Sequence, residues 1–477
     1  MKGAINMNNI GSRRELFLDN HLIDTLDGAS LKLQVPRPGG TALIYGEGKN
    51  AHLEGHMAHY TTVLEDAGTY RMYHRTNTYE RTDRGFESLT SYVESSDGIN
   101  WSRPSLGLVE VDGSSENNII LKSGWQFCPF VDKRPGVPIS ERYKGNARHQ
   151  DGLKGYVSPD GIHWKEVSEE VVVPNSLKNH FDAQNSMFWS EFEEQYVLYA
   201  RHMEAPADVA RRATAKATSL DFVNWSEPTK MTYSDTGSEI PSEHLYTNQT
   251  TPYWRAPHIY ISMPGRIFFD RRKLSPDEQE YGDRELDPGI GKPQDCSDGV
   301  LLTSRAGTTE YDFTFLESFV RPGIGQNNWT SRNNYPALGV VPAGATEMAF
   351  YVQRDSGQKN AYLERMLLRL DGFSSLNGPY AGGEATTKVI SFDGDELRVN
   401  YATSAAGRIK MEIQDEKGNP VKGYELDRFD ELIGDEIDRK VSWGGVSSVS
   451  ALSDKNVRLR FVLSDADLFS YKFQPGT

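Results

Sequence analysis

A seven-residue phrase that recurs at nearly constant spacing constrains this chain more than any other feature. It reads SSDGINW at residues 95–101, SPDGIHW at residues 158–164 and SLDFVNW at residues 219–225, so its three tryptophans lie 63 and then 61 residues apart. Repetition at a fixed period indicates one structural unit that is copied around an axis or along a stack. The chain is therefore predicted to be a repeat protein.

The sequence around the phrase repeats as well. Residues 61–75 and 186–201, ahead of the first and third copies, both read as two alternating strands joined by an acidic turn. Each unit thus reads as a four-stranded antiparallel sheet. Serine and aspartate at the head of the phrase can accept backbone N–H bonds in a turn, and the tryptophan can pack between neighbouring sheets. We therefore predict that Asp97, Asp160 and Asp221 fasten turns and are not catalytic.

Two degenerate copies complete the set of repeats. Residues 258–269 and 299–313 form a fourth unit, which is stretched by the polar insert 270–295, and residues 333–373 form a fifth. Sheets repeated about an axis are typical of a β-propeller. The segment at residues 14–24 is expected to supply a strand that closes the ring.

The pattern changes beyond Phe373. Apolar and polar residues alternate there at the period of half-buried strands, with Gly and Asn-Pro turns between them, which is typical of a β-sandwich. The predicted fold class is all-β. The predicted domains are a five-bladed β-propeller with its N-terminal closing segment, residues 1–373, and a C-terminal β-sandwich, residues 374–477.

Composition excludes several classes of partner. The formal net charge of −15 argues against nucleic acid and anionic membrane surfaces, which both require basic patches. No stretch approaches the roughly 18 apolar residues of a membrane span, and the first residues lack the apolar core of a secretory signal. We expect a cytoplasmic protein, or a periplasmic or secreted one if a signal was removed before this numbering. The oligomeric state is left open.

The polar side chains that could carry chemistry precede the predicted innermost strands. In a propeller these strands surround a central channel, and side chains at the ends where they begin meet at one mouth of it. Carboxylates, amides, histidines and aromatic rings gathered there suit sugar recognition. Hydrolysis of a glycosidic bond needs two carboxyl groups that flank the anomeric carbon. The predicted catalytic residues are Glu54, Asp182 and Glu243.

A second group of residues is predicted to hold sugar hydroxyls: Asp132, Asn185, Arg255, His258, Asp298 and Asn333. Ordinary structural roles compete with these assignments, because a single aspartate before a strand often caps a turn, and Arg255 and His258 can pin a strand. The histidines at positions 52, 56 and 59 do not match a familiar zinc motif. No metal or other cofactor is predicted, and the expected partner is a carbohydrate.

Several phrases resemble those of a group of bacterial proteins similar to the family 32 and family 43 glycoside hydrolases. They are FDAQNSMFW, EHLYTN, WRAPHIY, SDGVLLTSR and FLESFVRPG, followed by the sandwich-like C-terminal stretch. The resemblance covers essentially the whole chain and implies a five-bladed propeller enzyme. The W-x-N-D-P-N-G, R-D-P and E-C motifs of true family 32 enzymes are absent from the sequence, so no catalytic residue is carried over.

The function expected from these features is a glycoside hydrolase that acts on plant or algal oligosaccharides or polysaccharides with paired carboxylates. Because a closed ring makes a pocket, we expect exo action. One alternative is a carbohydrate-binding propeller without catalysis. Another is a sialidase-like enzyme, since the repeated phrases resemble sialidase Asp boxes shortened by one residue. Arg75, Arg201 and Arg255 would then form an arginine triad beside a tyrosine nucleophile.

Overall fold

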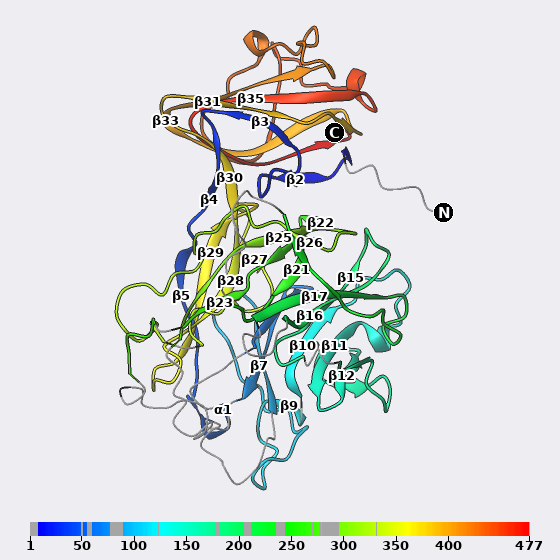
Figure 1. The fold of residues 1–477 in the computed structure, drawn as a ribbon, viewed down its shortest axis with the longest axis vertical. Coiled ribbons are helices and arrows are strands. Elements are labelled where there is room, and N and C mark those ends of the chain that lie inside the picture. Colours follow the sequence, from blue (N-terminus) through cyan, green and yellow to red (C-terminus); the bar gives the residue numbers. More distant parts are fainter. Residues whose placement is uncertain are drawn as a thin grey trace. The chain divides into compact units, whose positions relative to one another are not determined.

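The computed structural model of the chain consists almost entirely of β-strands (Figure 1). It describes residues 8–48, 51–54, 60–76, 89–122, 124–176, 181–204, 211–234, 244–269, 271–275, 278, 295–330 and 332–476. The strands fall into two compact units. Pro36–Leu367 form a five-bladed propeller, and Met1–Val35 together with Leu368–Thr477 form the second unit.

The first three blades are antiparallel sheets in which each strand pairs with the next along the chain, except that β14 of blade two pairs with β12. Blade one contains β6 (Thr62–Asp66), β7 (Thr69–Thr76), β8 (Leu89–Ser95) and β9 (Ile119–Lys122). Blade two contains β10 (Trp125–Val131), β11 (Tyr143–His149), β12 (Gly152–Ser158), β13 (Lys165–Glu166) and β14 (Val173–Pro174). Blade three contains β15 (Ser186–Ser190), β16 (Gln195–Glu204), β17 (Arg211–Ser219) and β18 (Thr229–Lys230).

Blades four and five are less regular. Blade four is built on β21 (Thr250–Tyr253), β22 (Ala256–Ser262) and β25 (Leu302–Arg305). Two small sheets accompany it: β19 (Thr232–Tyr233) with β26 (Glu310–Tyr311), and β20 (His244–Leu245) with β23 (Gly265–Phe268) and β24 (Cys296–Gly299). Blade five contains β27 (Val341–Pro342), β28 (Glu347–Arg354), β29 (Tyr362–Arg369) and β5 (Arg37–Ile44). The predicted five-bladed propeller is confirmed.

The strand that closes the ring is not the predicted one. β5 pairs with β29 and becomes the outer strand of blade five, so the start of the propeller completes its last blade. The segment at residues 14–24 instead contributes β2 (Arg14–Leu16) and β3 (Ile23–Asp27), which pair with strands of the second unit. Its apolar side chains belong to the core of that unit, which accounts for the difference.

The repeated phrase forms the predicted turn in all three places. In the first copy the Ser95 hydroxyl accepts the N–H of Gly98, and the Asp97 carboxylate accepts the N–H groups of Ile99 and Asn100. The copies headed by Ser158 and by Ser219 make the same set of bonds. The interpretation of these aspartates as turn fasteners is therefore confirmed by their hydrogen bonds.

The same turns also join neighbouring blades. The Tyr351 hydroxyl of blade five donates to the Gly98 carbonyl at 2.7 Å, and the Tyr73 hydroxyl of blade one donates to the Gly161 carbonyl at 2.9 Å. A Cβ at Gly161 would stand 2.7 Å from that hydroxyl oxygen, and both glycines have positive φ. Glycine is thus required at position 161 both because the Tyr73 hydroxyl leaves no room for a Cβ and because φ is positive.

The second unit is a β-sandwich, as predicted, with N-terminal strands in addition. Its longest strands, β33 (Glu396–Gln414) and β35 (Asn456–Gln474), pair along most of their length. The shorter strands are β1 (Asn9–Gly11), β4 (Ser30–Leu33), β30 (Ser374–Gly378), β31 (Gly383–Thr387), β32 (Ile390–Phe392) and β34 (Asp435–Lys440). Trp443 and Phe461 lie fully buried in its core.

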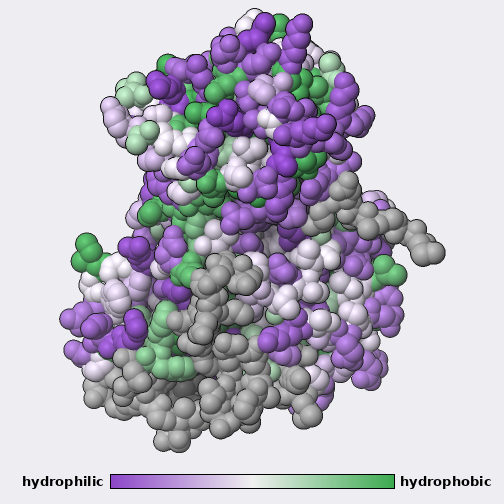
Figure 2. Space-filling view, turned by 45° about the horizontal axis from the view of Figure 1, so that its top comes forward, coloured by the Kyte–Doolittle hydropathy of each residue, from purple (hydrophilic) through white to green (hydrophobic). Residues whose placement is uncertain are grey.

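Hydrophilic residues predominate on the face of the molecule that Figure 2 shows, with hydrophobic ones scattered among them. Within the described ranges no helix has the length and apolar character needed to cross a membrane.

Candidate active site

Five residues with an unusual backbone mark one end of the propeller channel. We call this end, where the innermost strands begin, the N-terminal mouth. Each blade has a non-glycine residue with positive φ within its innermost strand or in the segment that leads into it: Tyr60, Gln126, Phe181, Gln249 and Asn334. Such conformations are costly for residues other than glycine and concentrate at functional sites. The N-terminal mouth is therefore the candidate active site.

A network of buried amides supports this mouth from below. The Gln184 side chain donates to the Thr62 hydroxyl at 2.7 Å and accepts from Gln249 at 2.9 Å, which links blades one, three and four. Asn248 accepts from the Ser186 hydroxyl. Because buried amides must be hydrogen-bonded, these contacts fix the backbone from which the mouth residues project.

Asp182 is the predicted catalytic residue that the structure places at the mouth. Its side chain is 57% exposed, and its Oδ1 lies 3.1 Å from Arg148 Nη1 and 3.1 Å from Gln126 Nε2. Burial acts to raise the pKa of this carboxyl, but Arg148 and Arg201 outweigh that effect and hold the pKa below its ordinary value. Asp182 is therefore an ionised carboxylate within reach of a ligand.

A β-bulge next to Asp182 shapes the same corner. The register of β10 against β11 shifts between Trp125 and Cys128, at the position where Gln126 has its positive φ. Bulges re-aim side chains beside active sites. Here the bulge directs the Gln126 amide to Asp182 and leaves Trp125 half-buried, opposite Arg148 on the neighbouring strand.

Arginines and aromatic rings line the mouth. The guanidinium carbons of Arg75 and Arg148 lie 5.7 and 5.1 Å from the centre of the Trp125 ring. Those of Arg201 and Arg212 lie 4.9 and 5.2 Å from the centre of the Tyr246 ring. Cation–π contacts at these distances hold a guanidinium in place over the ring. The mouth thus offers two positioned sets of cationic donors.

A pair of tyrosines completes the arrangement. Tyr60 and Tyr246 share a hydrogen bond between their hydroxyl groups. Burial acts to raise the pKa of Tyr246, but Arg332, Arg201 and the bond with Tyr60 outweigh it, so that this pKa is lowered. Burial dominates at Tyr60 and raises its pKa. Tyr246 is the phenol in this mouth that ionises more readily than a free tyrosine.

The structure encloses the side chain of Glu54. Glu54 ends the short helix α1 (Ala51–Glu54) and is only 1% exposed. Its two oxygens accept from Arg103 at 2.6 and 2.8 Å. Burial acts to raise its pKa, yet His74 and Arg103 lower it to about 2. An enclosed carboxylate with both oxygens bonded is typical of a structural ion pair, so this geometry does not favour catalysis by Glu54, and its catalytic assignment stays a prediction.

Glu243, the third predicted catalytic residue, lies outside the described residues. It precedes His244 at the start of β20 and stands three positions before Tyr246 of the mouth. Its assignment as a catalytic residue stays a prediction.

Asp132 and Asp298, predicted to bind substrate, are committed to buried ion pairs. Asp132 follows the far end of β10 and contacts Lys144 at 2.8 Å and the Tyr196 hydroxyl at 2.7 Å. Asp298 lies on β24 and receives two bonds from Arg266, at 3.0 and 2.7 Å. Each carboxylate neutralises a cation of its own blade, and this ion pair is enough to account for the buried carboxylate.

Asn185 and Asn333 are buried scaffold residues rather than ligand contacts. The Asn185 amide donates to the carbonyls of Phe181 and Ala183 and accepts the N–H of Arg201. Asn185 thereby fixes the loop that carries Asp182, and so supports the mouth indirectly. The Asn333 side chain accepts the N–H of Ser356 and is 0% exposed.

Arg255 and His258 do not reach the N-terminal mouth. The innermost strand of blade four is β21, and WRAPH forms the hairpin that leads into β22. Arg255 in this turn lies over the Trp254 ring at 5.6 Å, and the buried His258 packs 5.3 Å from Phe192. Sequence reading had assigned the start of the innermost strand to the wrong segment, because blade four is irregular.

The site residues that sequence reasoning did not nominate are Trp125, Gln126, Arg148, Tyr60 and Tyr246. Four of them, all except Arg148, stand in segments that open a blade: HLEGHMAHY (52–60), WQFCPFVD (125–132) and EHLYTN (243–248). The aromatic residues within those segments were the sequence signal that could have identified these site residues. Arg148 and the bulge at Gln126 reach the site through the pairing of β10 with β11. No local sequence pattern predicts that pairing.

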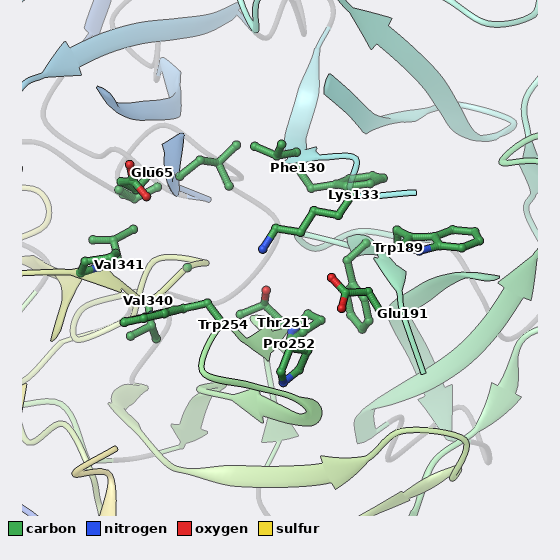
Figure 3. A pocket seen from close by; sticks show the side chains of 17 residues that line it. Glu65, Phe130, Lys133, Trp189, Glu191, Thr251, Pro252, Trp254, Val340 and Val341 are labelled. Atoms are coloured by element: carbon green, nitrogen blue, oxygen red, sulfur yellow. The ribbon is translucent and has the colours of Figure 1, made fainter. Parts of the chain in front are cut away.

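The opposite end of the channel, which we call the C-terminal mouth, has a pocket of about 350 Å³. Apolar side chains form much of its wall, and the rings of Trp189 and Trp254 are among them (Figure 3). The Lys133 amine points into the pocket, while Glu65 and Glu191 lie on different sides of it. The two predicted catalytic residues that the structure describes, Glu54 and Asp182, do not line this pocket. Among the described residues, no cluster of three or more His, Cys, Asp or Glu side chains is arranged to bind a metal.

Comparison with known proteins gives structural likenesses only. No protein-family model matches the chain, and no curated protein matches it. A solved structure described as a glycoside hydrolase is 9% identical, with a TM-score of 0.45, over 70% of this chain and 92% of its own. An N-acetylgalactosamine deacetylase from F. plautii, in complex with blood group B trisaccharide, is 11% identical with a TM-score of 0.45, over 72% and 96%.

A third similar structure is a family 43 arabinoxylan arabinofuranohydrolase from Bacillus subtilis in complex with cellotetraose. It is 12% identical with a TM-score of 0.38, and the match covers 88% of this chain and 96% of that one. Similar structures thus include glycoside hydrolases and a deacetylase. The choice of a reaction for this chain depends on its own site.

Proposed function

We propose that the chain is a glycoside hydrolase with its reaction site at the N-terminal mouth. The observation that carries this proposal is Asp182, an ionised and accessible carboxylate held beside aromatic rings, amides and guanidinium groups. Sugar rings stack on aromatic faces, and their hydroxyls pair with amides and carboxylates. The expected substrates are plant or algal oligosaccharides or polysaccharides, and the closed ring of blades favours exo action.

The protonation state of Asp182 decides its role. Because its pKa is lowered, it is the base or nucleophile of the two-carboxylate mechanism and not the proton donor. The proton donor must be a group with a higher pKa, and Glu243 is the residue proposed for it from the sequence. Tyr60 and Tyr246 would orient the sugar ring against Asp182.

A second mechanism has support from Tyr246. Some glycosidases use a tyrosine nucleophile, and Arg332 and Arg201 favour the phenolate form of this residue. This version corresponds to the sialidase-like alternative. Of the three arginines cast in that alternative, Arg75 and Arg201 both act on the Asp182 carboxylate, whereas Arg255 lies in a hairpin away from it.

The proposal is tested with a panel of aryl glycosides and of plant and algal oligosaccharides. Wild-type protein is expected to hydrolyse at least one of them, and Asp182→Asn to lose about 1,000-fold or more of kcat/KM. Asp66→Asn is the matched control, because Asp66 is also an aspartate paired with an arginine, Arg142, but stands at the far end of its innermost strand.

The panel also separates the alternatives. Hydrolysis that survives Asp182→Asn would remove this residue from the reaction. Binding of an oligosaccharide without any hydrolysis would favour the carbohydrate-binding propeller. Loss of activity in Tyr246→Phe as deep as in Asp182→Asn would favour the tyrosine nucleophile.

A further inference from the structure

The N-terminal mouth is rich in arginine although the whole chain is acidic. Formal net charge over the chain is −15. Yet three guanidinium groups, those of Arg148, Arg201 and Arg75, act together on the single carboxylate of Asp182. Only Arg148 among them forms an ion pair with it, at 3.1 Å. These three cations outnumber the one carboxylate of Asp182, and the next described carboxylate, Asp295, lies on the side of Tyr246 and Arg201.

Arg75 is the least compensated of these groups. Its Nε is buried and has no hydrogen-bond partner in the part of the chain that the structure describes. The contact that positions the guanidinium is the Trp125 ring, 5.7 Å away, over which Arg148 also lies. Arg75 and Arg148 come from different blades, on β7 and β11, and Trp125 brings them to one place.

Two guanidinium groups over one ring form a receptor for an anion. A guanidinium matches a carboxylate or a sulfate by two parallel N–H bonds, and pairing with an anion offsets the cost of removing it from water. Neutral hydroxyls use neither the charge nor the paired geometry. The arrangement is therefore better suited to an anionic group than to a neutral sugar.

We propose, on the basis of the hydrolase function inferred above, that the substrate is an acidic sugar whose carboxylate or sulfate group is bound by Arg75 and Arg148. The anion would sit beside Trp125, and the ring that bears it would face Asp182. Repulsion between the anion and Asp182 is offset because Arg148 contacts both positions.

Calorimetric titration with matched pairs of oligosaccharides tests the inference. Trigalacturonate is compared with its methyl ester, which lacks the charge, and a sulfated carrageenan oligosaccharide with its desulfated form. The wild-type protein is expected to bind the charged member of one pair at least tenfold more tightly than the neutral member. The pair that shows this preference identifies carboxylate or sulfate as the recognised group.

Variants assign the preference to the arginines. Arg75→Gln is expected to weaken binding of the charged member by about 10- to 100-fold and to leave the neutral member within about twofold. Arg134→Gln is the matched control, since Arg134 also lies 5.7 Å over a ring, that of Tyr196, but follows the far end of β10. Arg148→Gln provides a second test if Arg75→Gln does not fold.

Equal binding of charged and neutral members, no binding of any charged member, or full affinity in Arg75→Gln would overturn the inference. Because binding is measured apart from turnover, the hydrolase function and the acidic substrate can be contradicted independently of each other. Selective binding of the anion without hydrolysis of any glycan would contradict the hydrolase function alone. Hydrolysis of neutral glycans with no preference for charge would contradict the acidic substrate alone.

Discussion

Glu54 and Asp182 are both propeller carboxylates paired with an arginine, but their surroundings differ. Glu54 is enclosed, and both of its oxygens are bonded by Arg103. Asp182 keeps more than half of its side chain exposed, and a single oxygen holds its two contacts. Both have a lowered pKa. Arginine pairing alone therefore does not separate these two carboxylates, whereas the accessibility of their oxygens does.

The largest expected effect on stability is that of breaking the enclosed pair. Glu54→Gln leaves the Arg103 guanidinium without its anion, and the loss of one partner of a buried pair costs about 3–5 kcal/mol. Chemical denaturation should show this decrease in the free energy of unfolding. A double variant, Glu54→Leu with Arg103→Leu, should recover part of it. A Glu54→Gln protein as stable as wild type would mean that the pair is not enclosed.

Acidification should remove the stabilisation that the enclosed Glu54 carboxylate provides. The pKa of Glu54 is about 2 in the folded protein against an ordinary 4.5. Its stabilisation of about 3 kcal/mol is thus complete above the unfolded pKa and is lost as pH falls toward 2. The difference in unfolding free energy between wild type and Glu54→Gln should shrink when measured at pH 7, 4.5 and 3. A constant difference would contradict the assignment.

An intermediate effect is expected at the turn fasteners. Asp97→Ala removes the acceptor of two backbone N–H groups, which costs about 1–2 kcal/mol. The equivalent changes at Asp160 and Asp221 should have similar effects, because their turns make the same bonds. Thermal unfolding of the three variants checks this, and glycan hydrolysis should persist in each. A loss of activity in a variant that stays folded would assign a catalytic role to that aspartate.

The smallest effect on stability is expected at Asp182 itself. Exposed ion pairs contribute about 0.2–1 kcal/mol, so Asp182→Asn should unfold within about 1 kcal/mol of wild type. The measurement is denaturant unfolding of Asp182→Asn beside Glu54→Gln. A destabilisation as large as that of Glu54→Gln would place Asp182 in the scaffold.

The fold was predictable because its signals are local. The repeated phrase has its own turn chemistry, and each copy stands next to strands that alternate clearly. The partner of a strand has no such local mark. Residues 14–24 were expected to close the ring, but they pair with the second unit, and β5 closes the ring by pairing with β29.

The candidate site was predictable in part. Asp182 precedes an innermost strand in the sequence and lies at the mouth. Glu54 precedes one as well, yet its role is decided by Arg103, which is distant in sequence. The positive φ of Gln126 and the shared position of Arg75 and Arg148 follow from a bulge and from the pairing of blades, and neither changes the local sequence pattern.

The most direct test of the account is the kcat/KM of Asp182→Asn on a glycan that the wild-type protein hydrolyses, measured on protein shown to be folded. We predict a loss of about 1,000-fold or more with nearly unchanged stability. Retention of kcat/KM within tenfold of wild type would contradict the claim that the accessible carboxylate of the N-terminal mouth carries out the reaction.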